Sequence, residues 1–282
     1  MTLKKFQELD LSNAFLFAVV MQDGETCRMV LEIILQKSID KVKVQVEHSI
    51  LYSTDFRSVR LDVYASDEMQ VDYNLEMQNE KERNLAKRSR YYQVQMDVQA
   101  LKPGEAIEDL RPNYIIFICA FDPFDRGLYR YTFENRCVED NFPLEDGTVK
   151  LFLNTKGKNG EEVPEVLVNF LRYLENSTDE CAGSLEDRTI DRLHAKVTAI
   201  KESREWEGRY MTFEELLQER EKAGRREGQK LGREEGQRES QEKLLQLIRL
   251  MSEEGETEQI PRLSSDSGFF REMYEKYIES RE

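Results

Sequence analysis

The sequence predicts a mixed α/β fold in which helices flank a sheet and a mostly helical extension follows at the C-terminal end. Three observations predict this fold class. Segments with alternating apolar and polar residues, which are typical of strands, lie between segments with the spacing of helices. One near-continuous apolar run, residues 113–120 (NYIIFICA), suits a strand that is covered on both faces. The final part of the chain is highly charged and then becomes amphipathic with a helical period.

The first zone of the chain ends at about residue 139 and contains most of the expected elements. Apolar periodicity indicates the type of each element, and polar breaks indicate its ends. In order, we expect helices at 13–22 and 27–37, strands at 42–48, 57–65 and 73–78, a long helix at 82–101, and the strand at 113–120.

The second zone, residues 142–204, is expected to complete the first domain. A turn at 145–147 precedes an expected strand at 149–153, and a polar break follows that strand. Helices are expected at 165–174 and 188–210. We therefore expect one domain over residues 1–210.

The third zone has a different composition, with glycines at 224, 228, 232 and 236 among charged and polar residues. Each glycine costs a helix about 1 kcal/mol relative to alanine. A four-residue period winds slowly around a helix and suits the close approach of a second helix. We expect a charged helical linker at 211–243 and a small helical segment at 244–282.

Two interpretations of this third zone stay open. It is either a spacer or a surface for self-association, in which case the chain forms a homo-oligomer through its C-terminal helices. A DNA-binding helix-turn-helix is a further interpretation of the last segment, but its acid-rich composition favours contact with protein.

The composition excludes several classes of protein. A net charge of −15 argues against a chain held on nucleic acid by bulk electrostatics, although it is compatible with a local basic patch. No segment approaches the ~20 apolar residues of a membrane span, so we expect a soluble, cytoplasmic protein with no membrane partner. Four scattered cysteines form no CxxC pair, and two histidines make a histidine-rich metal site improbable. Any metal would be held by oxygen ligands, which favours Mg²⁺, Mn²⁺ or Ca²⁺.

Two neighbouring expected strands each carry an acid on their polar face. Asp62 lies in VRLDVYA, and Glu76 lies in YNLEMQ with Gln78 two residues later. If the strands form a hairpin, they lie about 4.8 Å apart and the two carboxylates converge. Two close carboxylates repel each other and favour a divalent cation between them, which can activate water for phosphodiester hydrolysis. The alternative is an ordinary solvated strand face, because acids commonly alternate outward.

The helix that follows these strands is locally basic. Residues 81–90 contain five bases and one acid, and Lys87, Arg88 and Arg90 lie beside Tyr92 and Gln93. Cations with aromatic and amide neighbours suit contacts with phosphates and stacking on bases. For any one of these residues, a solvated helix face is the alternative.

Several of these motifs together resemble the PD-(D/E)xK nuclease family transposases, also called recombination-promoting (Rpn) nucleases. The motifs LSNAFLFAVVM, VRLDVYASDE, YNLEMQ, LAKRSRYYQVQMD, YIIFICAFDPF, YTFENRC and LFLNTKG occur in this order over roughly residues 7–210. The resemblance implies a restriction-endonuclease-like core and metal-dependent DNA cleavage that promotes recombination.

The resemblance also implies roles for individual residues. Asp62 and Glu76 would hold the metal, and Gln78 takes the place that is a lysine in the wider superfamily. Arg88, Tyr92 and Gln93 would match the conserved helix of the family. In some superfamily members an acid on the first helix assists the metal, and Glu32 is the candidate for that role here.

Three functions are compatible with these residues. The leading one is a metal-dependent DNA endonuclease in recombination or mobile-element biology, with Gln78 orienting the water. The second is a catalytically weak DNA-binding or interaction protein that retains the nuclease fold. The third, a phosphatase-like hydrolase of small phosphoesters, explains the basic aromatic helix less well, because a small substrate does not need that surface.

Overall fold

The computed structural model describes residues 4–46, 63–81 and 84–279. The chain divides into two compact units, Met1–Glu214 and Glu215–Glu282. Within the described part of the chain, no helix combines the length and the apolar content needed to cross a membrane.

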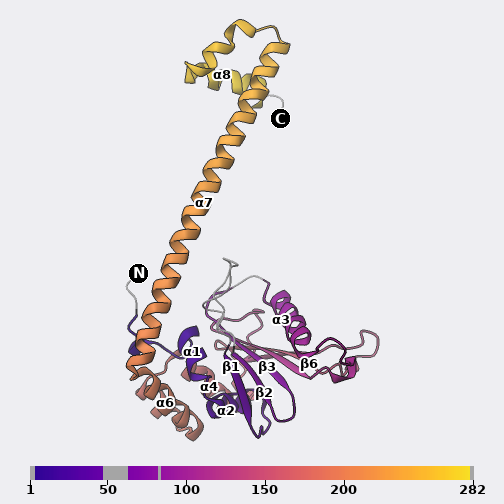
Figure 1. Ribbon diagram of the computed structural model, residues 1–282, viewed down its shortest axis with the longest axis vertical. Coiled ribbons are helices and arrows are strands. Elements are labelled where there is room, and N and C mark those ends of the chain that lie inside the picture. The colour runs from indigo at the N-terminus through magenta and orange to yellow at the C-terminus, as the bar shows by residue number, and fades with distance from the viewer. Residues whose placement is uncertain (1–3, 47–62, 82–83, 280–282) are drawn as a thin grey trace. The chain divides into compact units, whose positions relative to one another are not determined.

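The first unit is built on a six-stranded sheet (Figure 1). Its strands lie in the order β1-β2-β3-β4-β6-β5. Pairing is antiparallel from β1 to β3, parallel between β3, β4 and β6, and antiparallel between β6 and the edge strand β5. The strands are β1 (Val42–Val46), β2 (Val63–Asp67), β3 (Asp72–Gln78), β4 (Asn113–Cys119), β5 (Arg130–Phe133) and β6 (Thr148–Asn154).

Helices cover both faces of this sheet, which confirms the predicted fold class. Figure 1 shows the sheet between α3 and the group formed by α1, α2, α4 and α6. The helices of the unit are η1 (Phe6–Glu8), α1 (Ala14–Val20), α2 (Gly24–Leu35), α3 (Leu85–Ala100), η2 (Ile107–Asp109), η3 (Gly160–Glu162), α4 (Glu165–Glu175), α5 (Asp179–Leu185) and α6 (Arg188–Lys201). The side chains of Asn13, Asp23, Thr178 and Asp187 accept backbone hydrogen bonds where α1, α2, α5 and α6 begin.

Strand β4 is buried on both sides, as its apolar run predicts. From Ile115 to Cys119 every residue is almost completely buried. Ile115, Phe117 and Cys119 belong to a cluster that also contains Tyr92 and Met96 of α3. Alternate residues of a strand point to opposite faces, so α3 covers the face of the sheet that carries these three side chains.

The second unit contains most of a long helix and a small C-terminal cluster. Helix α7 (Arg204–Glu253) is continuous through all four repeated glycines and is followed by η4 (Thr257–Ser264) and α8 (Ser267–Tyr277). Asp266 begins α8 by accepting hydrogen bonds from two backbone N–H groups. A separate apolar cluster holds this end together, formed by Leu247, Met251, Leu263, Phe269, Met273, Tyr277 and Ile278.

Some expected elements differ from the structure. The single helix expected at 188–210 is wrong, because α6 ends at Lys201 and α7 begins at Arg204. Ser203 starts the new helix, and its carbonyl oxygen accepts the hydrogen bond of Glu207 N. The short elements β5 and α5 were not predicted. Residues 57–62 of the strand expected at 57–65 lie outside the described residues. The described strand β2 begins at Val63 and continues to Asp67.

Candidate metal-dependent nuclease site

Strand β3 carries its alternating polar side chains on one face. Asn74, Glu76 and Gln78 alternate along the strand and are only 0%, 7% and 8% exposed. In the parallel pairing with β4, Glu76 lies opposite Phe117 and Gln78 opposite Cys119. The three polar residues therefore share the face that α3 covers. Because Glu76 and Gln78 are buried, the solvated-face alternative does not hold for them.

Arg88 of α3 is the centre of the hydrogen bonds in this cluster. Its Nη2 donates to Glu76 Oε1, and its Nη1 donates to Gln78 Oε1 over 3.2 Å. Gln78 Nε2 donates to the same Glu76 Oε1 over 2.5 Å. The guanidinium also donates to the Tyr92 hydroxyl, with Nη2 at 2.8 Å. We call Glu76, Gln78, Arg88 and Tyr92 the Glu76 cluster.

Helix α3 delivers Arg88 and Tyr92 to the strand because they are four residues apart and therefore lie on one helix face. Tyr92 is 1% exposed, and its ring stacks on Phe117 with 5.9 Å between the ring centroids. The guanidinium lies 5.5 Å from the Tyr92 ring and 5.6 Å from the Phe117 ring. Aromatic faces attract a cation at this distance, so the positive charge has a fixed place beside Glu76.

The ion pair between Arg88 and Glu76 lies largely out of water. Only 25% of the Arg88 side chain and 9% of the Glu76 side chain are exposed. Removing such charges from water costs several kcal/mol per ion, and their attraction often does no more than offset that cost. The pair is therefore weak evidence for a role in stability.

The structure places the other expected DNA-contacting residues differently. Lys87 and Arg90 are exposed on α3, and Gln93 is half-buried. Tyr92 faces inward, and its hydroxyl accepts from Arg88. The neighbouring Tyr91, which is 55% exposed, presents an aromatic ring on the outside of the same helix.

Of the two other expected acids, only Glu32 lies within the described residues, and it is bonded away from the Glu76 cluster. Asp62 lies outside the described residues. Glu32 of α2 accepts hydrogen bonds at Oε1 from Arg28 Nη1 and from the Ile39 backbone, both over 3.0 Å. These bonds hold the Glu32 carboxylate against the segment that follows α2, where it stabilises the local structure.

Sequence reasoning missed two features of the site. It assigned Arg88 to DNA contact and did not foresee its bonds to Glu76 and Gln78; the four-residue spacing from Arg88 to Tyr92 is the signal that could have indicated a shared inward face. It also passed over Asn74 as a site residue. Neither side-chain polar atom of Asn74 has a hydrogen-bond partner among the residues that the structure describes, and the alternation 74, 76, 78 was the available signal.

The donor chemistry of the site fits a hard divalent cation. A carboxylate and an amide offer the oxygen ligands that Mg²⁺, Mn²⁺ and Ca²⁺ prefer. Glu76 Oε1 is paired with the Arg88 guanidinium in this structure, so a metal would share that oxygen with Arg88 or displace it. No group of three or more His, Cys, Asp or Glu residues with metal-binding geometry occurs in the described part of the chain. Glu76 and Gln78 would therefore need further ligands from water, substrate or residues outside that part.

Cys119 of β4 is fully buried beside this site and is poorly suited to act as a nucleophile. Burial raises the pKa of the Cys119 thiol to about 12, and the negative charge of Glu76 is the second largest cause of this shift. The thiol therefore stays protonated near neutral pH, and only the thiolate is a nucleophile. Hydrolysis by an activated water is the chemistry that the Glu76 cluster suits.

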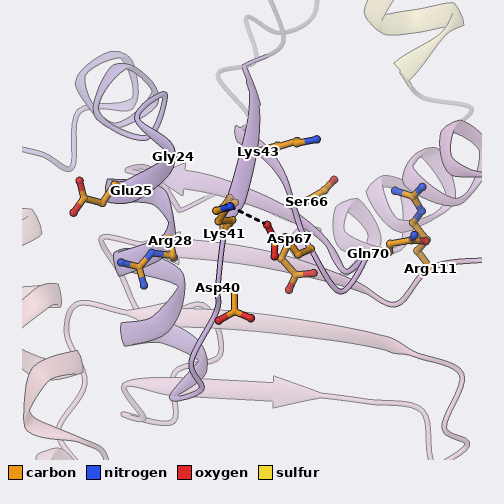
Figure 2. A pocket seen from close by; sticks show the side chains of 12 residues that line it. Gly24, Glu25, Arg28, Asp40, Lys41, Lys43, Ser66, Asp67, Gln70 and Arg111 are labelled. Carbon is orange, nitrogen blue, oxygen red and sulfur yellow. Dashed lines mark ion pairs between the residues drawn. The ribbon is translucent and has the colours of Figure 1, made fainter.

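A polar cavity lies near the opposite, amino-terminal end of β3 (Figure 2). It has a volume of about 570 Å³, and its charged residues largely pair with one another or with nearby groups. Lys41 pairs with Glu68 at 3.5 Å, and Asp67 accepts from the hydroxyl of Tyr73 over 2.7 Å. The lining residues are Gly24, Glu25, Arg28, Asp40, Lys41, Val42, Lys43, Ser66, Asp67, Glu68, Gln70 and Arg111. We call this cavity the hairpin pocket; it contains none of the residues of the Glu76 cluster.

Comparison with known proteins agrees with this geometry. No curated protein and no solved structure matches the chain. The family model described as PD-(D/E)XK nuclease family transposase matches residues 21–225, which is more than half of the chain and includes β3 and α3. A nuclease family of this kind generally uses divalent metals and acts on DNA. The match over most of the chain and the mixed sheet show that the protein belongs to the PD-(D/E)XK nuclease family transposases.

Proposed function

We propose that the protein is a divalent-metal-dependent DNA endonuclease that hydrolyses phosphodiester bonds, and that this cleavage promotes recombination or serves a mobile element. The observation that carries the proposal is the burial of the Glu76 carboxylate and the Gln78 amide on one strand face under a basic helix. Family membership supports a nuclease. A cytoplasmic protein without a membrane partner is part of the same proposal.

The proposed roles follow from side-chain chemistry. Glu76 and Asp62 would hold the metal, preferably Mg²⁺, which when bound lowers the pKa of a water molecule and neutralises charge on the phosphate. Gln78 has both donor and acceptor atoms and would orient the attacking water. Glu32 remains a candidate assisting acid only if its present bonds to Arg28 and Ile39 are exchanged.

The register of the hairpin supports the role of Asp62. In the described part of β2 and β3, Tyr64 pairs with Asn74 and Val63 pairs with Leu75. Position 62 has the same parity as Tyr64, and Glu76 has the same parity as Asn74, so the sequence assigns both acids to one face of the predicted hairpin. Two carboxylates that converge on one face suit a shared divalent cation.

The exposed side of α3 is the proposed DNA contact surface. Lys87 and Arg90 can reach phosphates, and the half-buried Gln93 adds an amide donor. Arg88 and Tyr92 would support this surface from its inner side, where they meet β3. The affinity should fall steeply with added salt because phosphate contacts release counterions.

The test is nicking of supercoiled plasmid by the purified protein in Mg²⁺, Mn²⁺, Ca²⁺ and EDTA, with Asp62→Ala and Glu76→Ala in parallel. Glu68→Ala, which changes an acid of the hairpin pocket, is the matched control. Cleavage that needs a metal, Asp62 and Glu76, and that survives in the control, supports the endonuclease. A folded protein that retains plasmid but never cuts it with any metal would favour the alternative, a DNA-binding protein on a nuclease fold.

We also propose that the C-terminal helices carry self-association. Leu247 and Met251 are fully buried inside the second unit's own cluster, so they are not available for a partner. Leu231, Leu244 and Leu245 of α7 are exposed. Light scattering should show a lower mass for Leu231→Asp/Leu245→Asp than for the wild type. An unchanged mass in the double variant would refute this part of the proposal.

A further inference from the structure

The Glu76 cluster contains a single positive charge, and that charge comes from the helix and not from the strand. Position 78 is a neutral glutamine, two residues after the acid. The guanidinium of Arg88 lies one hydrogen bond beyond it, with Nη1 at 3.2 Å from Gln78 Oε1. The same guanidinium donates to Glu76 Oε1. The positive charge therefore contacts both polar groups that β3 offers.

Arg88 is held in this position more firmly than an exposed arginine would be. Tyr92, one helical turn further on, accepts from its Nη2 over 2.8 Å and from its Nε over 3.3 Å. The guanidinium also lies beside the stacked rings of Tyr92 and Phe117. A planar guanidinium with several directed donors can bond Glu76, Gln78 and Tyr92 together, which an ammonium group does less well.

We propose that Arg88 is a positioning residue that supplies to the proposed nuclease site the positive charge that Gln78 does not provide, and that it holds the Glu76 carboxylate while no metal is bound. The inference rests on the proposed function. Its consequence is competition: a metal at Glu76 and the guanidinium of Arg88 repel each other and share one carboxylate oxygen.

Three variants separate charge from packing. Arg88→Met keeps a long side chain and removes the charge. Arg88→Lys keeps the charge with fewer donors. The double variant Arg88→Met/Gln78→Lys returns a positive charge to the Glu76 cluster from the strand. Each full-length protein is measured by thermal melting, by calorimetric titration with Mn²⁺, and by plasmid cleavage.

We expect Arg88→Met to bind Mn²⁺ about three- to tenfold more tightly than the wild type, because a neighbouring like charge has been removed. Its cleavage rate should fall by about 10²-fold or more, the size of the loss when one stabilising donor is removed from an active site. Arg88→Lys and the double variant should both regain at least about a tenth of the wild-type rate. If Arg88 only supported the fold, the Arg88→Met protein would lose metal affinity and cleavage together. A lysine at position 78 would then not restore cleavage.

Several results would overturn the inference. If the wild type cleaves DNA and Arg88→Met cleaves at the same rate, the role of Arg88 is refuted. The proposed nuclease function is then unaffected. Weaker Mn²⁺ binding by a folded Arg88→Met also overturns it. If Arg88→Met does not fold, the double variant decides: failure of that protein to fold or to cleave refutes a role for the charge. A wild-type protein that binds Mn²⁺ but cuts no DNA overturns the proposed function itself.

Discussion

The two ends of β3 are both polar, and the difference between them shows which kind of polar cluster indicates chemistry. At the amino end, the hairpin pocket is open and its acids and bases pair near the surface; Lys41 and Glu68 keep 80% and 55% of their side chains exposed. At the carboxyl end, Glu76 and Gln78 are buried under α3. Charges at a surface cost little to keep in place, whereas a buried carboxylate requires a compensating group. Burial, and not the number of charges, distinguishes the candidate site.

The largest expected effect tests this contrast directly. Glu76→Gln removes the buried charge with little change in shape and should lower metal-dependent DNA cleavage by about 10²–10³-fold. Glu68→Gln makes the same chemical change in the hairpin pocket and should leave cleavage within about twofold. Plasmid nicking rates of both variants in Mg²⁺ decide between the two ends, and equal losses would contradict the assignment.

A close backbone contact at the hairpin pocket, between Gly24 and Val42, should affect stability and not activity. A Cβ atom at Gly24, the first residue of α2, would lie 2.8 Å from the carbonyl oxygen of Val42 in β1. Gly24→Ala should therefore lower the free energy of unfolding by about 1–3 kcal/mol. Gly183→Ala in α5, where no atom lies within 4 Å of the added Cβ, should instead raise it by about 0.5–1 kcal/mol. Urea unfolding measures both, and a neutral Gly24→Ala would show that β1 can move away.

An acid that follows β4 gives a pH-dependent prediction close to the carboxyl end. Burial tends to raise the pKa of Asp122, but hydrogen bonds from the Tyr131 hydroxyl and the Gly127 and Phe124 backbones outweigh it and lower that pKa. A carboxyl group with a lowered pKa in the folded state stabilises the protein above its ordinary pKa of about 3.9. That contribution is lost as the pH falls through the lower folded value.

Asp122→Asn should therefore lower the free energy of unfolding by about 1 kcal/mol at pH 7. It should lower this free energy less near pH 3, where the wild type has begun to lose the same contribution. Urea titrations at the two pH values test the sign. A loss that grows toward acid pH would contradict it.

The smallest expected effect lies again in the hairpin pocket. Lys41→Gln removes an ion pair between two largely exposed side chains. Such pairs contribute between about 0 and 1 kcal/mol, so the change in the free energy of unfolding should stay below about 0.5 kcal/mol. A loss several times larger would mean that the pocket is more than a solvated surface.

Local pattern was enough to predict much of the fold. Alternation predicted β3 and its polar face, the apolar run predicted β4, and the helical periodicity of residues 82–101 predicted α3. The break after Lys201 was missed because neither Gly nor Pro marks it, and β5 was missed because four residues on a sheet edge carry little periodic signal.

The candidate site was only partly predictable. Strand alternation placed Glu76 and Gln78 on one face. It does not indicate whether that face is buried, because burial depends on the packing of α3 over it. The direction of Arg88 depends on the rotation of α3 about its axis, and the polar and apolar residues of this helix are spread around it and give only a weak amphipathic signal. Glu32 looked available in sequence, yet a backbone N–H seven residues later takes up its carboxylate.

The segment of α7 that contains the four repeated glycines is free to change in length. Residues 221–246 are exposed throughout, and nothing lies within 4 Å of the Cβ position at any of the four repeated glycines. An in-frame gain or loss of one four-residue repeat would lengthen or shorten the helix by about 6 Å and rotate the residues after the repeat by about 40° around the helix axis. Neither the sheet nor the C-terminal apolar cluster would lose a contact. The length of this segment is therefore fixed neither by the sheet nor by the C-terminal apolar cluster.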